Sequence, residues 1–355
     1  MYYYKLGLGH PKLLDIGRSL KGFLVDRTGI LDQSHKVLTP LPQLPEVAPD
    51  YFTICDNRGK ELLQKSQDEN LEIRVAYSGG MDSTTALVSL LKFKDDYPQA
   101  DIKVCLNQKS IDEYPYFYEN FLKDNPQVEL FFGETFNAEG VGENQTIGMN
   151  LNRDTGKDFF VVTGEIGDQI FGSKTILQAP QLAYIDYRDV FPEETCQFIN
   201  PFIDEMPIKN TESAAVLSWM NFALKYQWCE LRMYAMFDIP WEKYHHFFDT
   251  DEFQQWSMLT PMDVKFPEYT DTFYKLPTKE YIRDFVGDQT YYENKVKVPS
   301  MQTVTYKFDN PSIQIISIDE YFKKTYKDQS DRVWAVTENE DGTVTAVANN
   351  IEISM

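Results

Sequence analysis

The chain has 355 residues, of which 42% are hydrophobic and 14% aromatic, a composition that fits a folded protein with about two domains. Its formal net charge of −21 argues against broad binding to nucleic acids or anionic membranes, because positive surfaces hold phosphate groups. The sequence contains no signal peptide and no apolar run long enough to cross a bilayer, which indicates a cytoplasmic protein.

The cysteines point to the same compartment. They lie far apart, form no C-x-x-C pair and have no histidine at zinc spacing. We therefore expect buried thiols in a reducing cytoplasm at Cys55, Cys105, Cys196 and Cys229.

Residues 1–70 are predicted to form a small N-terminal segment. Residues 23–38 could be a β-hairpin that turns at Thr28-Gly29. The proline-spaced stretch 40–49 is typical of an extended linker.

The main domain is predicted over residues 71–300, and it begins with a strand, a glycine turn and a helix over residues 71–93. Ile73, Val75 and Tyr77 suit a buried strand. The spacing of Leu87, Leu90 and Leu91 favours a helix that packs on a sheet. Two adjacent glycines and flanking serines at a helix N-terminus predict a phosphate-binding loop, whose residues are Ser78, Gly79, Gly80, Asp82 and Ser83.

Asp82 decides which kind of phosphate loop this is. A Walker-type loop would carry Lys-Ser or Lys-Thr after its last glycine, and this chain does not. A carboxylate repels a polyphosphate unless a divalent cation lies between them, so Asp82 indicates Mg²⁺. The alternative is a serine-glycine turn that caps an ordinary helix.

Alternating strands and helices up to about residue 172 predict an α/β fold with a doubly wound parallel sheet. Further strands are expected over residues 102–106, 128–132 and 159–162, and a helix over residues 113–123. In such sheets the ligand binds beyond the carboxyl ends of the strands, so the loops after Tyr77, Leu106 and Val162 should face one crevice.

The loop after Val162 carries a second acidic, glycine-spaced turn, TGEIGDQIFGS. It could bring Asp168 opposite Asp82, which would give two carboxylates for one Mg²⁺. Taken alone, the turn could equally be a loop with a helix cap.

The first turn resembles the SGGxDS signature of the PP-loop ATP pyrophosphatases, and the second is similar to the SGEGSDELFGG segment of asparagine synthetases and their β-lactam-forming relatives. Five residues of the second segment match: Gly164, Glu165, Asp168, Phe171 and Gly172. Ile166 and Gln169 replace a glycine and a glutamate. The resemblance covers roughly residues 71–300 and implies a PP-loop synthetase domain with a helical C-terminal half, which binds ATP with help from Gly164.

Two later segments carry a looser resemblance. Residues 242–249 are similar to the family's ExRxPFLD segment without its arginine and proline, which implies that Glu242 assists the attacking amine. Residues 279–283 resemble the family's KxxLR helix, and residues 293–299 its lysine loop, in which Lys295 matches the catalytic lysine and Lys297 is the second choice. Glu242 could instead be an exposed helix residue, and Lys295 a solvated lysine.

The resemblance implies an ATP-dependent carbon-nitrogen ligase that releases AMP and pyrophosphate. It would join a small-molecule carboxylate to an amine or ammonia. Residues 1–70 are too short for a glutaminase domain, so ammonia would come free or from a separate glutaminase chain. The rivals are another PP-loop enzyme that modifies a nucleobase or RNA, and an ATP-binding scaffold without catalysis.

Residues 301–355 are predicted to be a C-terminal tail. A β-hairpin is expected over residues 333–347, with its turn at Asp341-Gly342.

Overall fold

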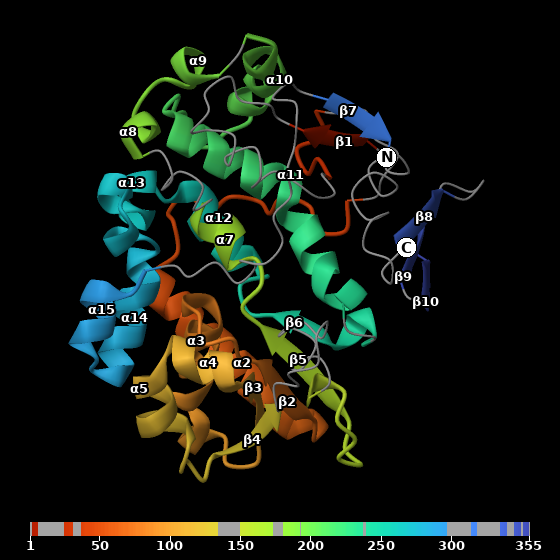
Figure 1. The fold of residues 1–355 in the computed structure, drawn as a ribbon, viewed down its shortest axis with the longest axis vertical. Coiled ribbons are helices and arrows are strands. Elements are labelled where there is room, and N and C mark those ends of the chain that lie inside the picture. Colours follow the sequence, from red (N-terminus) through yellow and green to blue (C-terminus); the bar gives the residue numbers. More distant parts are fainter. Residues whose placement is uncertain are drawn as a thin grey trace. The chain divides into compact units, whose positions relative to one another are not determined.

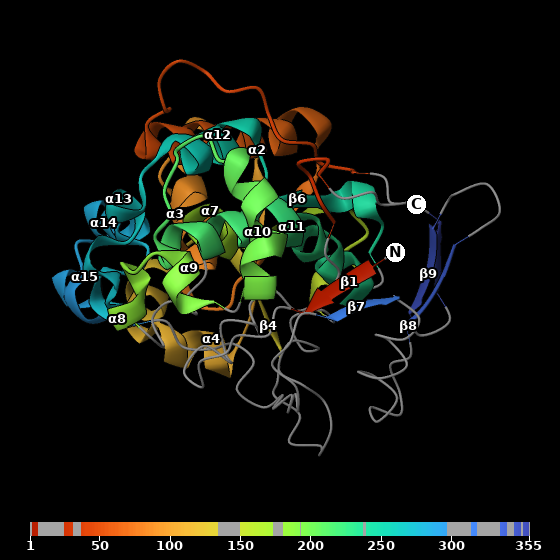
Figure 2. The same ribbon diagram turned by 90° about the horizontal axis from the view of Figure 1, so that it is seen from above.

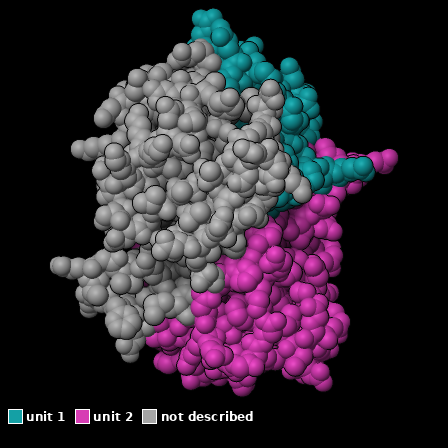
Figure 3. Space-filling view, turned by 90° about the vertical axis from the view of Figure 1, so that its right-hand side faces the viewer, with its two compact units in different colours: residues 1–43, 171–236, 301–355 teal, residues 44–170, 237–300 magenta. Residues whose placement is uncertain are grey.

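The computed structural model describes part of the chain, namely residues 2–5, 25–30, 37–133, 150–172, 180–191, 193–236, 239–296, 314–317, 334–338, 344–348 and 351–354. The chain divides into two compact units, each assembled from separate stretches. Unit 1 comprises residues 1–43, 171–236 and 301–355, and unit 2 comprises residues 44–170 and 237–300. Figure 3 colours the two units separately.

Unit 2 is built on a sheet of five parallel strands in the order β4-β3-β2-β5-β6 (Figure 1). The strands are β2 (Glu72–Ala76), β3 (Asp101–Asn107), β4 (Val128–Gly133), β5 (Phe159–Thr163) and β6 (Tyr244–His246). The sheet confirms the predicted α/β class, and β3, β4 and β5 lie where strands were predicted.

Strand β2 is buried on both faces, as expected for a central parallel strand. Ile73, Val75 and Tyr77, predicted as core residues, are fully buried. Glu72 and Arg74, which alternate with them, are 2% and 1% exposed. A buried charge is tolerated only when it is paired and hydrogen-bonded, so the second face of β2 requires polar partners.

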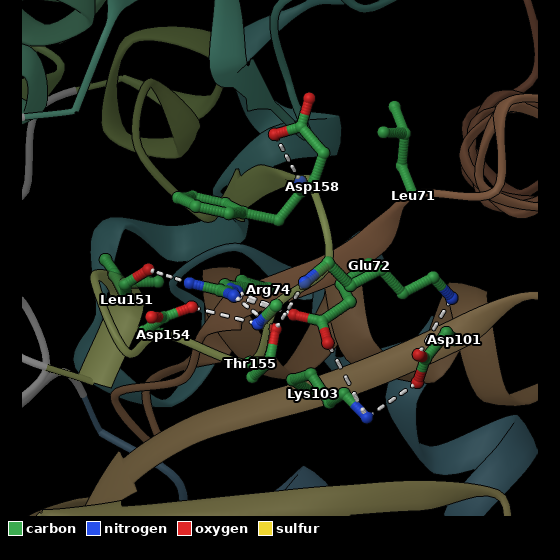
Figure 4. Close-up of polar contacts among 12 residues, drawn as sticks. Leu71, Glu72, Arg74, Asp101, Lys103, Leu151, Asp154, Thr155 and Asp158 are labelled. Atoms are coloured by element: carbon green, nitrogen blue, oxygen red, sulfur yellow. Dashed lines mark hydrogen bonds and ion pairs between the residues drawn. The ribbon is translucent and has the colours of Figure 1, made fainter.

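Those partners surround Arg74 towards the amino ends of β2 and β5 (Figure 4). Its guanidinium donates to Glu72 Oε2 at 2.7 Å and to the carbonyl oxygen of Leu151 at 2.7 Å. It also lies 3.6 Å from the ring centroid of Phe159, so its faces are covered as well as its N–H groups. The buried charge of Arg74 is therefore paired and hydrogen-bonded, and the cluster has a structural role in the sheet.

Helices of unit 2 cover the sheet and pack on one another. They are α2 (Tyr51–Glu69), α3 (Met81–Leu91), α4 (Gln108–Glu113), α5 (Pro115–Phe117), α12 (Asp251–Leu259), α13 (Met262–Lys265), α14 (Leu276–Val286) and α15 (Gln289–Asn294). α2 and α3 approach so closely that a Cβ at Gly59 would lie 2.3 Å from the carbonyl oxygen of Ser89. α14 packs against α3 and α15, and Figures 1 and 2 show α14 and α15 side by side.

The helix predicted over residues 113–123 begins earlier and is interrupted. Asn107 and Ser110 form a reciprocal capping box that starts α4 at Gln108. Pro115 disfavours helical backbone at the preceding residue, and Tyr114 has φ −145°. The segment therefore continues as α5 and a π-helical turn, Tyr118–Leu122.

Unit 1 contains a long helix, α11 (Ser213–Met236), the shorter helices α8 (Pro180–Ala183), α9 (Tyr187–Val190) and α10 (Glu193–Asp204), and antiparallel strands. β1 (Tyr2–Lys5) pairs with β7 (Gln314–Ser317), and β8 (Trp334–Glu338), β9 (Val344–Ala348) and β10 (Ile351–Ser354) form a meander. The β8–β9 pair confirms the predicted C-terminal hairpin, whose turn lies outside the described residues. Residues 25–30 of the proposed N-terminal hairpin are not a strand, and much of its remainder is not described.

Two further expectations concern the described residues. The four cysteines are all buried free thiols, as predicted. Among the described helices, none has the length and apolar character that a membrane crossing requires.

Lys265, at the end of α13, is a buried cation of unit 2 with an unusual environment. It is 5% exposed, and its Nζ donates to the carbonyl oxygen of Ser257 and lies 3.2 Å from Ser257 Oγ. Ser257 Oγ in turn donates to the carbonyl oxygen of Ile170 at 2.6 Å. In the part of the chain that the structure describes, no carboxylate pairs with this amine, and burial lowers the pKa of Lys265 to about 7.

We expect Lys265→Met to raise the free energy of unfolding by on the order of 3 kcal/mol at pH 7, because burial makes the protonated amine of Lys265 unfavourable in the folded protein. Between pH 7 and about 10.5 the unfolded chain binds more protons than the folded one, so wild-type stability rises with pH. The gain should therefore be full at pH 6 and shrink as the pH approaches 10. Urea unfolding at pH 6, 8 and 10 measures it, with Lys123→Met, at an exposed position, as control. A loss of stability at every pH would contradict this account.

Candidate functional site

The candidate site lies where the strand order of unit 2 reverses. β2 and β5 are neighbours, with β3 and β4 on one side of them and β6 on the other. Open parallel sheets bind ligands outside the carboxyl ends of the strands at such a reversal. The loops that follow β2 and β5 are the two acidic turns, and their residues 78–83 and 164–170 belong to unit 2.

The first turn, residues 78–83, is closed by its serines. Ser78 Oγ lies 3.0 Å from Ser83 Oγ, and the backbone N–H of Gly80 donates to Ser78 Oγ at 3.3 Å. Gly79 has φ +75°, and a Cβ there would lie 2.2 Å from the carbonyl oxygen of Ser110, so only glycine fits. The turn leads into the N-terminus of α3, whose unpaired N–H groups favour an anion.

The second turn packs directly on Asp82. A Cβ at Gly164 would lie 2.6 Å from the backbone nitrogen of Ser83, and one at Gly167 would lie 2.5 Å from the Asp82 carboxylate. Between these glycines, Ile166 adopts φ 74° with a buried side chain. A β-branched residue is strained there, and this is a position where the related motif carries glycine.

Lys275 joins the two turns. Its Nζ donates to both carboxylate oxygens of Asp82 at 2.6 Å and lies 2.8 Å from Asp168 Oδ1. Tyr274 OH donates to the same oxygen of Asp168 at 2.8 Å. Lys275 itself has φ 54°, a left-handed backbone that directs a fully buried side chain between the two acids. The structure therefore brings Asp82 and Asp168 to one point.

The charges of this trio do not cancel. Burial acts to lower the pKa of Lys275, but Asp168 and Asp82 outweigh it, and the pKa is raised, so the ammonium persists at neutral pH. One positive charge faces two carboxylates, which leaves a net charge of about −1. Asp82 and Asp168 are 23% and 41% exposed, so this negative charge faces solvent.

These carboxylates fit a Mg²⁺ ion that is shared with a phosphate. The described residues contain no group of three or more acidic, histidine or cysteine side chains arranged to hold a metal. Mg²⁺ in nucleotide sites, however, is typically bound by one or two carboxylates together with phosphate oxygens and water. Two partly exposed carboxylates with a residual negative charge meet that requirement.

Lys295 lies close to the first turn. It follows α15, and its Nζ forms an ion pair with Glu113 and donates to the Glu113 carbonyl oxygen at 3.2 Å. Glu113 in turn packs against Gly79, where an added Cβ would lie 2.8 Å from the Glu113 Cβ. Lys297, the second choice for the catalytic lysine, is outside the described residues.

Glu242 is not brought to the site. It is exposed and precedes β6, which runs parallel to β5 with Thr163 opposite His246. Its neighbour Lys243 pairs with Asp158, which precedes β5. Glu242 therefore lies at the amino edge of the sheet, whereas the two turns lie at the carboxyl edge. This placement corrects its predicted role, because a base that assists the amine must reach the reacting atoms.

Sequence reasoning missed Lys275, Tyr274 and Glu113. Lys275 stands 193 positions from Asp82 and in no motif, so spacing gave no signal. A lysine just before a Leu-Pro helix start is also an unremarkable pattern. Glu113 was predicted to begin a helix, but it ends α4, because Pro115 breaks the helix at Tyr114.

Replacing Lys275 by methionine should lower the free energy of unfolding by about 2–4 kcal/mol, because two neighbouring carboxylates lose their shared cation. Denaturant unfolding measures this change. Adding Asp82→Asn to the variant removes one of the two repelling charges and should restore part of the loss. Unchanged stability in Lys275→Met would contradict the bridging role of this lysine.

Ile166→Gly should be more stable than Ile166→Ala by about 1 kcal/mol, since both lose the buried contacts beyond Cβ but only glycine relieves the left-handed backbone. Thermal or denaturant unfolding of the two variants tests this order. At Val161, in the middle of β5, the same two substitutions should give the opposite order, with alanine the more stable. If the glycine and alanine variants showed the same order of stability at both positions, backbone strain at Ile166 would be excluded.

Comparisons with known proteins add no assignment to these observations. No protein-family model matches the chain, and no curated protein matches it.

Proposed function

We propose that the chain is an ATP-dependent, AMP-forming amide ligase of the PP-loop type. The observation that carries this proposal is the meeting of Asp82 and Asp168, from two separate glycine turns, at Lys275. The turns lie at the reversal of the strand order, which is the usual nucleotide position in such sheets. The resemblance of both turns to synthetase motifs gives the reaction class.

The first turn would hold the phosphates of ATP. Ser78 is exposed and offers a hydroxyl group, and the N-terminus of α3 offers backbone N–H groups. Gly79 and Gly80 keep the backbone bare on this side, and Ser83 fixes the loop from beneath through its contacts with Ser78 and Gly80. Gly164 keeps the second turn close to Asp82.

Asp82 and Asp168 would hold Mg²⁺, which supplies positive charge that offsets the charge of the phosphates. Lys275 orients both carboxylates from the buried side and fixes their spacing. Because the lysine is fully buried, its role is to position the acids, and the outer faces of the carboxylates remain directed to solvent.

In the proposed reaction a substrate carboxylate attacks the α-phosphorus of ATP, pyrophosphate leaves, and an amine or ammonia then displaces AMP. Negative charge builds up on the phosphorus centre in the first step, so a nearby ammonium stabilises it. Lys295, whose partner Glu113 packs against Gly79 of the first turn, fits this role. Because Glu242 lies at the other edge of the sheet, a different group must receive the amine.

Asp82→Asn should abolish Mg²⁺-dependent release of pyrophosphate from ATP, by at least about a hundredfold, because the variant loses a metal-binding charge. Pyrophosphate release is measured with a panel of carboxylates and amines, including ammonium chloride. Asp263→Asn, at an exposed position of α13, is the matched control and should retain wild-type turnover.

Normal turnover in Asp82→Asn would refute the metal assignment. Binding of ATP without pyrophosphate release for every pair would indicate the scaffold without catalysis instead. Tight RNA binding in a gel shift would favour an enzyme that modifies RNA.

A further inference from the structure

Glu113 already binds a primary ammonium group, that of Lys295. The ammonium contacts the Glu113 carboxylate and the Glu113 carbonyl oxygen. The side chain of Glu113 is 14% exposed and that of Lys295 is 9% exposed. An aromatic face completes the surroundings, because the same Nζ lies 5.8 Å from the ring centroid of Tyr291. A carboxylate, a carbonyl oxygen and an aromatic ring are the groups that recognise an alkylammonium ion.

Tyr291, whose ring lies near the Lys295 ammonium, carries a polar group without a hydrogen-bond partner among the described residues. The hydroxyl group of Tyr291 is buried and makes no hydrogen bond among the described residues. Burial raises the pKa of Tyr291 well above its usual range, and Tyr114, Tyr77, Asp82 and Glu113 raise it further, so the hydroxyl group stays protonated. Buried polar groups nearly always find a partner, and a neutral phenol oxygen can accept a hydrogen bond from an N–H group.

The Glu113–Lys295 pair also lies next to the first turn, because Glu113 packs against Gly79. If Lys295 moves to the phosphates, as the proposed function requires, it leaves Glu113 largely buried without a cation. An uncompensated buried charge is strongly unfavourable. The two uses of Lys295 therefore conflict unless another cation replaces it at Glu113.

We propose that Glu113 and Tyr291 form the binding site for the ammonium group of the second substrate, and that Lys295 occupies this site until nucleotide draws it to the phosphates. The proposal rests on the proposed function for the identity of the nucleotide, but the ammonium site can be tested without it. When nucleotide draws Lys295 away, the substrate ammonium replaces it beside the Glu113 carboxylate. When the substrate ammonium displaces Lys295, the phosphates of the nucleotide provide a new partner for the lysine. Binding of nucleotide and binding of amine therefore favour each other.

The first experiment uses the full chain with Lys295→Ala and n-propylammonium chloride, whose three carbons and nitrogen replace the atoms removed. At constant ionic strength, the probe should raise the thermal midpoint of Lys295→Ala in a saturable manner, and should not do so for wild type or for Lys295→Ala combined with Glu113→Gln. Tetramethylammonium, which lacks N–H groups, and the Lys123→Ala variant are the controls.

The second experiment measures methylammonium binding to wild type with and without Mg²⁺ and α,β-methylene-ATP. Nucleotide should increase the affinity at least about tenfold, and Glu113→Gln should abolish this increase. An ion pair with only a structural role would show no dependence on nucleotide.

Two results would overturn the proposal. One is a Lys295→Ala variant that binds n-propylammonium no better than wild type does. The other is nucleotide that binds but leaves methylammonium affinity unchanged. Failure of nucleotide to bind counts against the proposed function, and the Lys295→Ala result alone then decides whether Glu113 is an ammonium site.

Discussion

A single buried ammonium, that of Lys275, holds the candidate site together. The two acidic turns follow the adjacent strands β2 and β5, and the sheet brings the carboxylates of Asp82 and Asp168 close enough to repel each other. Lys275 resolves this repulsion from the buried side and leaves the outer faces negative. Glycine is also needed at positions 164 and 167, because a side chain at either position would collide with Asp82 or with its neighbour Ser83.

Unit 2 uses buried positive charge in three different ways. Arg74 is saturated by a carboxylate, a carbonyl oxygen and an aromatic face, and it serves the sheet. Lys275 is shared between two partly exposed acids, Asp82 and Asp168. Lys265 contacts Ser257 and the ring of Trp256 and pairs with no carboxylate among the described residues, and burial lowers its pKa to about 7. Of these three cations, Lys275 is the one whose carboxylate partners are partly exposed, with Asp82 at 23% and Asp168 at 41%.

The sheet and the two turns could be predicted because their signals are local. Ile73 and Val75 alternate in a strand, Gly79 and Gly80 mark the turn, and parallel strands place their carboxyl ends at one edge. Lys275 could not be found, because its position depends on a left-handed backbone that a lysine does not signal. Glu113 was missed because the break before Pro115, which is a local signal, was not recognised. Glu242 was given its role from a partially matching motif, which does not determine at which edge of the sheet the residue lies, and it precedes β6.

The separation of Asp82 from Lys275 has a consequence for biosynthesis. On the ribosome, β2 and β5 emerge long before residue 275, and the intervening stretch 171–236 belongs to the other unit. Until that lysine leaves the exit tunnel, the nascent sheet carries two like charges without their counter-ion, so its carboxyl edge stays loose. Bringing together residues this far apart in sequence has an entropic cost, which makes the contact between Lys275 and the carboxyl edge of the sheet a late event in folding.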